Sequence, residues 1–481
     1  MILTEVSGQS VQLLVNNEDL TGQGARLRVF DPVTEDLVAD FPGASVEQVD
    51  LACRAASRAF ADPEWANPEL RRKVLEKFSD LLVEHRDALM DTLLREIASP
   101  MNLQSNHIDT PAAFTRWFAA QAVKPRDREL GFNAARTGVS AIAYRPVGVV
   151  AAISAFNYPL LIGVTKSAAA LAAGCTVVLL SSPQAPLALS QMGQLIREAG
   201  FPPGVFNIIA GGADVGEALT RHQLVDKISF TGSVGVGRAV MRQAADGLRG
   251  VVLELGGKSA TILLPGTDFD KIAFQLHARY ARNAGQGCGS PTRILVEESQ
   301  YEEFCKASRA VYHKLKVGDP RNSDTILGPV INERQRNFVE TRVDEALQRG
   351  ARIIAGGGRP DIVKGWYLNP VLVGDLTNAD PLAREELFGP VSVVLTYRTI
   401  DEAIEIANDS ELGLKAYLYG DRAQCIDLAP RLRVGTVQIN GGSPLRPDAP
   451  MSGLKQSGLG AEWGQDGLRE FLTPQHIDVA V

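Results

Sequence analysis

Apolar residues recur at helical spacing near the start of the chain. Between residues 68 and 97 they stand mostly three or four positions apart, at Leu70, Val74, Phe78, Leu81, Leu82, Leu89, Leu93 and Ile97. Such a stripe predicts one amphipathic helix that packs its apolar face on the protein interior. Pro100 follows, and we expect the helix to end before it.

From residue 149 to residue 264 the pattern changes to short apolar runs separated by helical stretches. The runs are rich in β-branched residues and read VVAAISA, CTVVLLSS, VFNIIAG, KISFTGS, VVLEL and ATILL. Apolar strands joined by helices predict a parallel sheet covered on both faces, with a ligand crevice at the carboxyl ends of its strands. A nucleotide site is expected there.

A second mixed region runs from about residue 268 to residue 453. It holds further strand-like runs, RILVEE, VSVVLTY and GTVQIN, and a helix predicted by the capping box Thr399-Ile-Asp-Glu402. We interpret this region as another α/β domain, so the expected fold class is α/β. No repeat or linker marks the boundary, which the pattern places near Gly256 and Gly257.

Composition and charge exclude several classes of protein. The 481 residues are 45% hydrophobic and 22% charged, which is typical of a globular chain larger than one small module. The net charge of -7 gives no positive field for nucleic acid or an anionic membrane. The first ten residues show no export signal, and no apolar stretch is long enough to span a bilayer. We expect a cytoplasmic protein that binds neither nucleic acid nor a membrane.

The five cysteines indicate neither disulfides nor a zinc site, because their number is odd and no C-x-x-C pair occurs. Four lie in helix or strand patterns and are expected to be buried thiols: Cys53, Cys175, Cys305 and Cys425. The fifth lies in Gly285-Gln-Gly287-Cys288-Gly289-Ser290. Its glycines would let a substrate reach both the sulfur and nearby backbone N–H donors, which suits a nucleophile. A buried cysteine in a glycine-rich loop fits the segment equally well.

Other motifs narrow the reaction class further. A G-x-S-x-G elbow is absent, and Gly257-Lys258-Ser259 lacks the upstream glycine of a phosphate-binding loop because Val252 stands there. No histidine lies near the cysteine loop, so a Cys–His pair is not indicated. Glu254 ends an apolar strand, where desolvation would raise its pKa toward that of a general base. A helix cap or an ion pair remains an alternative for it.

A turn of small residues follows the run KISFT and opens a helix, reading Gly232-Ser233-Val-Gly235-Val236-Gly237. Small residues at a helix N-terminus let backbone N–H groups approach a phosphate. The spacing departs from G-x-G-x-x-G, so a tight strand-to-helix connection is the alternative.

Five segments together resemble the NAD(P)-dependent aldehyde dehydrogenase superfamily across nearly the whole chain. They stand in the order found in the family and read Phe156-Asn157-Tyr158-Pro159, Phe230-Thr-Gly-Ser233 through Gly237, Glu254-Leu-Gly-Gly257-Lys258, Gly285-Gln-Gly-Cys288, and Glu385-Glu386-Leu-Phe388-Gly-Pro390. Cys288 follows Glu254 as the nucleophile follows the base in that family.

The resemblance implies a three-part architecture. A Rossmann-like NAD(P)-binding domain is expected at residues 1–124 and 147–255, and an α/β catalytic domain at residues 256–455. A small β oligomerisation arm is expected at residues 125–146 and 456–481. Strands of such an arm pair across a subunit boundary, so we expect a homodimer or homotetramer.

The resemblance also implies the chemistry. Cys288 would attack the aldehyde carbon, and the Asn157 amide and the Cys288 N–H would hold the oxyanion. Hydride would pass to NAD or NADP, and Glu254 would activate the water that hydrolyses the thioester, with Lys166 assisting proton movement. The expected cofactor-binding residues are Ile153, Ser154, Phe156, Ser181, Gly232, Ser233, Gly235, Val236, Gly237, Leu255, Glu386 and Phe388.

One departure from the family concerns the adenosine ribose. Where the family usually has a lysine, and often a glutamate three residues later, this chain has Leu180 and Pro183. Loss of both groups removes charge-assisted hydrogen bonds and any repulsion of a 2′-phosphate. We therefore expect NAD with weakened affinity and tolerance of NADP, with Ser181 or Ser182 as substitutes.

The positions that match the aldehyde tunnel of the family are mostly apolar, which predicts an aliphatic or aromatic aldehyde rather than a short semialdehyde. They are Phe156, Tyr158, Ile162, Thr165, Gly287, Gly289, Leu445 and Met451. Arg446 would bind a distal carboxylate if it turned inward.

Two other functions fit the same fold. One is a catalytically silent binding or structural protein, which the loss of the lysine at position 180 favours and the presence of Cys288, Glu254 and Asn157 opposes. The other is a coenzyme A-acylating dehydrogenase, in which the thioester passes to a second thiol. Glu254 favours hydrolysis over that transfer.

Overall fold

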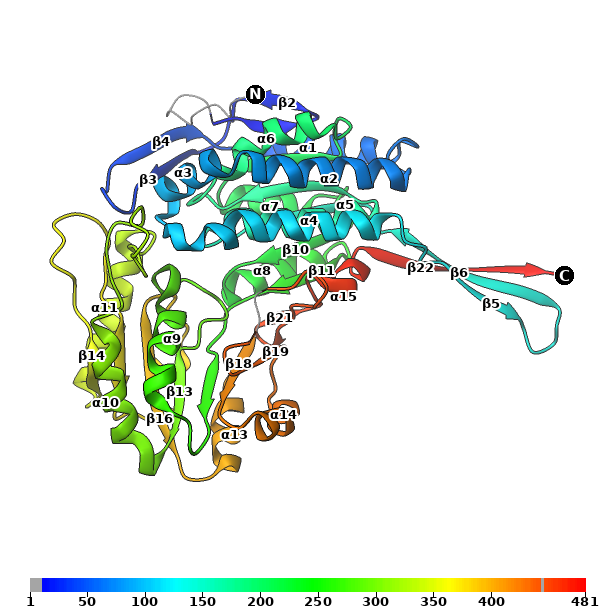
Figure 1. Ribbon diagram of the computed structural model, residues 1–481. Helices are drawn as coiled ribbons and strands as arrows, with labels where there is room; N and C mark the ends of the chain where they lie inside the picture. The colour runs from blue at the N-terminus through cyan, green and yellow to red at the C-terminus, as the bar shows by residue number, and fades with distance from the viewer. Residues whose placement is uncertain (1–10, 443–444) are drawn as a thin grey trace.

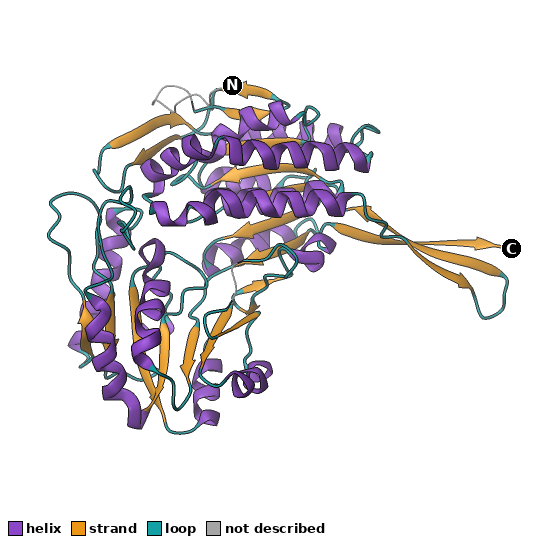
Figure 2. Cartoon of the chain, in the orientation of Figure 1, coloured by secondary structure: helices purple, strands orange, loops and turns teal. Residues whose placement is uncertain are grey.

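The computed structural model describes residues 11–442 and 445–481, arranged as two α/β units with an arm of strands (Figure 1). Residues 1–10, in which the sequence shows no export signal, lie outside the described part. Helices cover both units, as expected for the α/β fold class (Figure 2).

The first unit is built on an eight-stranded sheet in the order β2-β1-β9-β8-β7-β10-β11-β21. Its centre is the parallel set predicted from the apolar runs: β7 (Val149–Ile153), β8 (Thr176–Ser181), β9 (Phe206–Ala210), β10 (Lys227–Thr231) and β11 (Gly250–Glu254). Short antiparallel strands extend its two edges: β1 (Leu13–Val15), β2 (Glu18–Leu20) and β21 (Gly458–Leu459).

Helices pack on both faces of this sheet, because successive residues of a strand point to opposite sides. Val150 and Ala152 of β7 join one apolar core, whereas Val149, Ala151 and Ile153 join the other. The helices of this unit are α1 (Val46–Phe60), α2 (Pro68–Glu84), α3 (Arg86–Ile97), α4 (Thr110–Ala122), α5 (Pro159–Ala173), α6 (Leu187–Ala199), α7 (Ala213–Arg221) and α8 (Val234–Ala245).

The expected single helix over residues 68–97 was wrong. The chain leaves α2 after Glu84 and starts α3 at Arg86, with His85 between them at φ −96° and ψ 20°. Both helices bury their apolar residues in the same core, so the stripe continues through the break. The spacing of apolar residues indicates only which side of a helix is buried. It therefore did not reveal that the chain changes direction between α2 and α3.

The second unit is built on a seven-stranded sheet in the order β14-β15-β16-β13-β12-β18-β19. The run ATILL forms its strand β12 (Ala260–Leu263), so the chain changes sheet after Glu254. The other strands are β13 (Arg293–Glu297), β14 (Arg352–Gly356), β15 (Val371–Gly374), β16 (Val391–Tyr397), β18 (Lys415–Tyr419) and β19 (Thr436–Ile439). Its main helices are α9 (Phe269–Ala281), α10 (Tyr301–Tyr312), α11 (Glu333–Gln348) and α13 (Ile400–Asn408). Thr399 caps α13 as predicted, whereas the Glu402 carboxylate accepts a hydrogen bond from the Arg398 N–H and not from the Thr399 N–H.

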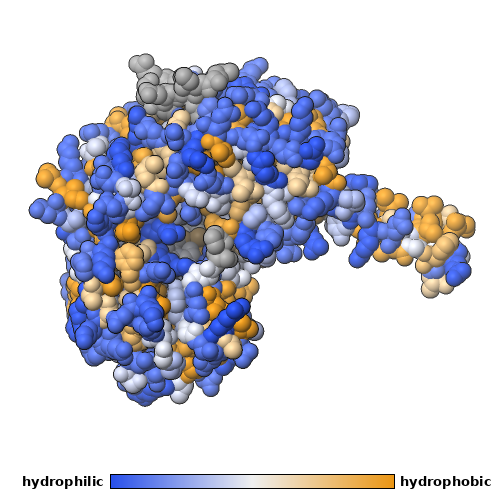
Figure 3. Space-filling view, viewed as in Figure 1, coloured by the Kyte–Doolittle hydropathy of each residue, from blue (hydrophilic) through white to orange (hydrophobic). Residues whose placement is uncertain are grey.

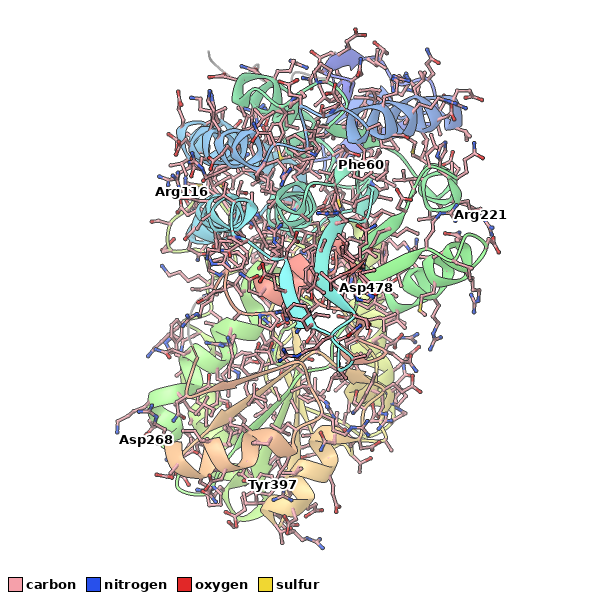
Figure 4. All side chains as sticks on the ribbon, turned by 90° about the vertical axis from the view of Figure 1, so that its right-hand side faces the viewer. Phe60, Arg116, Arg221, Asp268, Tyr397 and Asp478 are labelled. Atoms are coloured by element: carbon pink, nitrogen blue, oxygen red, sulfur yellow. The ribbon has the colours of Figure 1, made fainter. Side chains whose placement is uncertain are left out.

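The arm is a three-stranded sheet that extends away from both units (Figure 1). It consists of β5 (Arg128–Phe132), β6 (Gly138–Pro146) and β22 (Leu472–Ala480). In Figure 4 it points toward the viewer and carries the labelled Asp478. Residues 456–471, which the sequence assigned to the arm, instead hold β21 beside β11 and α15 (Gly464–Arg469) against α5. We therefore propose that the C-terminal piece of the arm begins at Leu472, and the other domain boundaries stay predictions.

Within residues 11–442 and 445–481, no helix is long and apolar enough to cross a membrane. The same residues contain no cluster of histidine, cysteine and acidic side chains that could hold a metal ion. Four cysteines are buried thiols as expected, and Cys288 is half-buried.

Candidate active site

A cavity of about 1330 Å³ opens where the carboxyl ends of the first sheet's strands face the second unit. Ser154 follows β7, Ser181 ends β8 and Glu254 ends β11, and all three line it. Typical small-molecule pockets have volumes of roughly 300–1,000 Å³, so this cavity has room for a dinucleotide and a second small molecule.

Most of the residues singled out from the sequence line this one cavity. The lining includes Cys288, Glu254 and Asn157, all of the expected tunnel positions, and every expected cofactor residue except Gly237. A Cβ at Gly237 would lie 2.7 Å from the Leu255 side chain, so this glycine allows helix and strand to pack closely.

Two further residues singled out from the sequence do not line the cavity. Lys166 is buried beside it and forms an ion pair with Glu462. Arg446 is exposed and forms a salt bridge with Asp448, so it does not turn inward.

The loop that carries Cys288 is held from two directions. The Asn157 side chain donates a hydrogen bond to the Gln286 carbonyl at 3.0 Å, and Asn283 donates back to the Asn157 carbonyl at 3.1 Å. The turn needs glycine at position 285, where φ is +74° and a Cβ would lie 2.1 Å from the Gly389 carbonyl oxygen. The Asn157 amide and the cysteine loop therefore form one rigid assembly.

Burial keeps the Cys288 thiol in its neutral form. Burial raises its pKa to about 12, the Glu254 and Glu386 carboxylates add to that effect, and the Lys415 ammonium opposes it. The sulfur is nevertheless at the cavity wall.

Glu254 is a buried carboxyl group with no partner. Its side chain is 2% exposed, and neither oxygen has a hydrogen-bond partner among the described residues. Burial raises its pKa well above the usual range, Glu462 raises it further, and Lys166 and Lys415 act in the opposite direction. Buried acceptors are rarely left unsatisfied in folded proteins, so an orphaned pair facing a cavity indicates a site for water or substrate.

Lys166 and Glu462 form a buried pair next to Glu254. The Lys166 ammonium also donates a hydrogen bond to Ser229 Oγ at 3.1 Å. Its side chain has no exposed surface, and that of Glu462 is 10% exposed. Because Glu462 lines the cavity, the pair links the interior to the space around Glu254.

Glu386 and Phe388 are positioned by close packing. Glu386 Oε1 accepts a hydrogen bond from the Gly257 N–H at 3.0 Å, and burial raises the pKa of Glu386 to about 7. A Cβ at Gly256 would lie 2.0 Å from Glu386 Oε2, so a larger residue there would displace the Glu386 carboxyl group. The Phe388 ring meets Phe156 edge to face at 5.7 Å.

The N-terminus of α8 offers free backbone donors to the cavity. Ser233 is the N-cap, and its hydroxyl accepts a hydrogen bond from the Val236 N–H at 3.4 Å. A Cβ at Gly235 would meet nothing within 4 Å, so the space in front of this helix end is open. Backbone N–H donors next to open space can bind a phosphate group. The cavity is also large enough for a dinucleotide, which contains such phosphates.

The end of the cavity expected to hold adenosine lacks a cation. Leu180 is buried and apolar, and the Ser181 hydroxyl donates to the Ile209 carbonyl at 3.3 Å, inside the sheet. Ser182, Gln184 and Glu217 also line the cavity. The polar side chains that line this end of the cavity are therefore neutral or acidic.

Sequence reasoning missed a polar wall that approaches the nucleophile from the second unit. Tyr417 donates a hydrogen bond from its hydroxyl to the Gly289 carbonyl at 2.6 Å, one residue after Cys288. The Arg279 guanidinium lies 5.3 Å from the Tyr417 ring centre and donates to Gln438 Oε1 at 2.6 Å. Lys415 completes this wall. The only signal in the sequence was a lysine and an arginine among apolar neighbours, which is usual for the ends of strands and helices.

Known proteins resemble this chain over nearly its whole length. A sequence model of the aldehyde dehydrogenase family matches residues 20–477. A chloroplastic betaine aldehyde dehydrogenase of Amaranthus hypochondriacus is 35% identical, over 94% of this chain and 92% of that protein.

Two solved structures have the same fold. The NAD+ complex of an aldehyde dehydrogenase from Bacillus cereus is 32% identical, with a TM-score of 0.95, and covers 99% of this chain and 97% of that one. An Escherichia coli NADP-dependent enzyme is 32% identical, with a TM-score of 0.94, and covers 98% of each chain.

Proposed function

Because the chain belongs to the aldehyde dehydrogenase family, we propose that Cys288 is the nucleophile with which this NAD(P)-dependent enzyme oxidises aldehydes to carboxylic acids. The observation that carries the proposal is the shared cavity. Its walls bring together the Cys288 sulfur, the Asn157 amide that is bonded to the cysteine loop, and the unpartnered carboxyl group of Glu254.

Acylation begins at the sulfur. Cys288 adds to the aldehyde carbon, and the thiol proton is lost to cavity solvent as the C–S bond forms, since burial keeps the resting thiol neutral. The remaining Asn157 N–H and the Cys288 backbone N–H stabilise the oxyanion of the thiohemiacetal. When bound, NAD(P)+ would supply the hydride acceptor that the oxidation of this adduct to a thioester needs.

Residues for holding the dinucleotide come from several elements. The α8 N-terminus, with Gly232, Ser233 and Gly235, would bind the pyrophosphate. Glu386 and Phe388 would hold the nicotinamide ribose and ring. Leu180 offers no charge to the adenosine ribose, so we expect modest affinity for NAD and tolerance of NADP.

Deacylation depends on Glu254. Its carboxylate takes a proton from water, the water oxygen attacks the thioester carbon, and the C–S bond breaks to release the acid and restore Cys288. Glu254 has two free acceptors for that water and a raised pKa, as a general base requires. The proton then passes toward the pair formed by Lys166 and Glu462.

The carbon chain of the aldehyde packs on an apolar wall. Ile162, Leu445 and Met451 line the cavity there, and Trp463 fixes the wall by stacking on Phe114 edge to face at 4.9 Å. This wall favours substrates with an aliphatic or aromatic body.

The arm pairs two copies of the chain. β22 is at the edge of its sheet, and apolar side chains are exposed along the arm, including Phe132 at 61% and Val479 at 54% (Figure 3). An exposed apolar edge strand is a liability unless it is covered, which supports a homodimer or homotetramer. Sedimentation velocity checks this: a monomer at micromolar concentration would contradict it.

The test of the reaction uses the whole protein with NAD+ or NADP+ and a panel of aldehydes. We expect reduced cofactor, followed by absorbance, and the matching carboxylic acid in equal amount. Cys288→Ala should lose this activity while keeping the unfolding temperature of the parent. Full activity in that variant would refute the assignment of the nucleophile.

A further inference from the structure

Three cations line the cavity around the nucleophile without a counter-ion. They are Lys415 at the start of β18, Arg279 near the end of α9, and Arg282 just after α9. None of them forms a salt bridge with any residue of the described part of the chain. Lys166, which is buried beside the cavity, differs from them because it is paired with Glu462.

Lys415 reaches the wall directly beside Cys288. Its side chain runs along Gly289, where a Cβ would lie 2.7 Å from Lys415 Cδ. The Lys415 ammonium is close enough to act on the pKa of both Cys288 and Glu254. A group bound by Lys415 would therefore lie within a few bonds of the carbonyl carbon under attack.

Arg279 is fixed as the second donor of this wall. It stacks on Tyr417 and donates hydrogen bonds to Gln438 Oε1 and to the Gly441 carbonyl. Its guanidinium has five N–H groups, so donors remain after these bonds are made. Tyr417 in turn is bonded to the Gly289 carbonyl at 2.6 Å. The wall is thus a rigid extension of the loop that holds the nucleophile. Arg282 is exposed and sits near Tyr158 on another side of the cavity.

Uncompensated charges in a concave site raise the local concentration of the opposite charge. The acidic groups of the lining near Cys288 form no salt bridge with these cations. Glu462 is paired with Lys166, Glu254 is desolvated, and Glu386 accepts a hydrogen bond from the Gly257 N–H. A neutral aldehyde would leave these cations unpaired when it displaces water, which is costly, whereas a carboxylate would satisfy them with charge-assisted hydrogen bonds.

We propose that the substrate is a short aldehyde that carries a carboxylate, which is held by Lys415 and Arg279 while its carbon chain lies on the apolar wall. This replaces the neutral aldehyde expected from the sequence, and it gives the role once considered for Arg446 to residues of α9 and β18. The inference rests on the proposed function of the same cavity.

The test compares two aldehydes of similar shape, succinic semialdehyde and 4-methylpentanal, by kcat/KM with NAD+. We expect the wild-type protein to prefer the acid by about tenfold or more, since charge-assisted bonds have that magnitude. Lys415→Met should lower this preference by about tenfold, chiefly through the KM of the acid. Lys415→Arg should retain most of it. Succinate should inhibit competitively, and succinamide should not.

A matched control and a second variant make the result decisive. Lys306→Met removes the same charge from an exposed position on α10, outside the cavity lining. It should leave kcat/KM unchanged for both succinic semialdehyde and 4-methylpentanal. Arg279→Gln removes the other residue proposed to hold the carboxylate. It should lower the preference for the acid in the same direction, and it tests the proposal if Lys415→Met fails to fold.

Two outcomes would overturn the inference. One is a wild-type preference for 4-methylpentanal. The other is an equal loss with both aldehydes in Lys415→Met, because Lys415 would then act on Cys288 rather than on the substrate. If neither these aldehydes nor the wider panel reduces the cofactor, the proposed function itself fails.

Discussion

Replacing Glu254 by glutamine separates the two halves of the proposed reaction. The substitution keeps the size of a side chain that is 2% exposed, and it breaks no hydrogen bond of the described residues because both carboxyl oxygens are unpartnered. One unpartnered polar group replaces another, so we expect the midpoint of thermal unfolding to move little. The variant should fold and still bind aldehyde and cofactor.

The magnitude follows from the loss of the general base. Such a base contributes roughly 10²- to 10⁴-fold to a rate, which corresponds to about 2.7–5.4 kcal/mol of activation free energy. Glu254→Gln should lower kcat by that factor, because thioester hydrolysis becomes rate-limiting. Acylation of Cys288 should be largely spared, since the oxyanion donors are unchanged.

Rapid mixing of the enzyme with aldehyde and NAD+ measures both halves. We expect a burst of reduced cofactor close to one equivalent per chain, followed by a slow steady state. Intact-mass analysis should find the acyl group on Cys288. The control Glu405→Gln, on the exposed side of α13, should behave like the parent.

The pH dependence provides an independent reading. The pKa of Glu254 is raised by burial, so the base form increases as pH rises through that value, and hydrolysis in the parent should rise with it. Glu254→Gln should lack this limb. Unchanged kcat in the variant, or complete loss of the burst, would refute the assignment of Glu254 to hydrolysis.

Three further predictions concern the nucleophile, the cofactor and the glycines. Burial raises the pKa of Cys288 to about 12, so alkylation of the free enzyme by iodoacetamide should accelerate about tenfold per pH unit from pH 7 to 9; a plateau below pH 8 would contradict this. Leu180→Lys should tighten NADP binding about tenfold or more by calorimetry, unlike Leu180→Met, and equal dissociation constants would count against the missing cation. Gly257→Ala places a Cβ 2.2 Å from the Cys288 carbonyl oxygen and should cost about 1–3 kcal/mol of stability in chemical denaturation, whereas Gly235→Ala, with open space around it, should cost none; equal stability of the two variants would disprove the clash.

The sequence was sufficient for the elements whose pattern is local. Continuous apolar runs gave β7 to β11, because a strand covered on both faces needs apolar residues at every position. The glycines around Cys288 and the carboxyl group of Glu254 in the run VVLEL indicated candidate chemistry, because these signals are also local in the sequence. Each signal depends on residues that are close in the chain.

The helix break at His85 and the return of β21 to the first sheet were not predictable in this way. Burial on one side is the same for one helix or two, so the stripe over residues 68–97 could not reveal a change of direction. The pairing of Gly458–Leu459 with β11 joins segments about two hundred residues apart, and nothing in two short residues encodes that partner.

The sequence by itself determined the α/β class, the parallel strands β7 to β11, and the residues around which an aldehyde dehydrogenase site is expected to form. The tertiary structure alone decided what surrounds them: the pairing of Lys166 with Glu462, the exposed position of Arg446, and the approach of Lys415 and Arg279 to the nucleophile. The physical reason is that the role of a charged residue cannot be inferred from its place in the sequence. Its effect depends on burial and on counter-ions, and both are set by segments that meet only when the chain is folded.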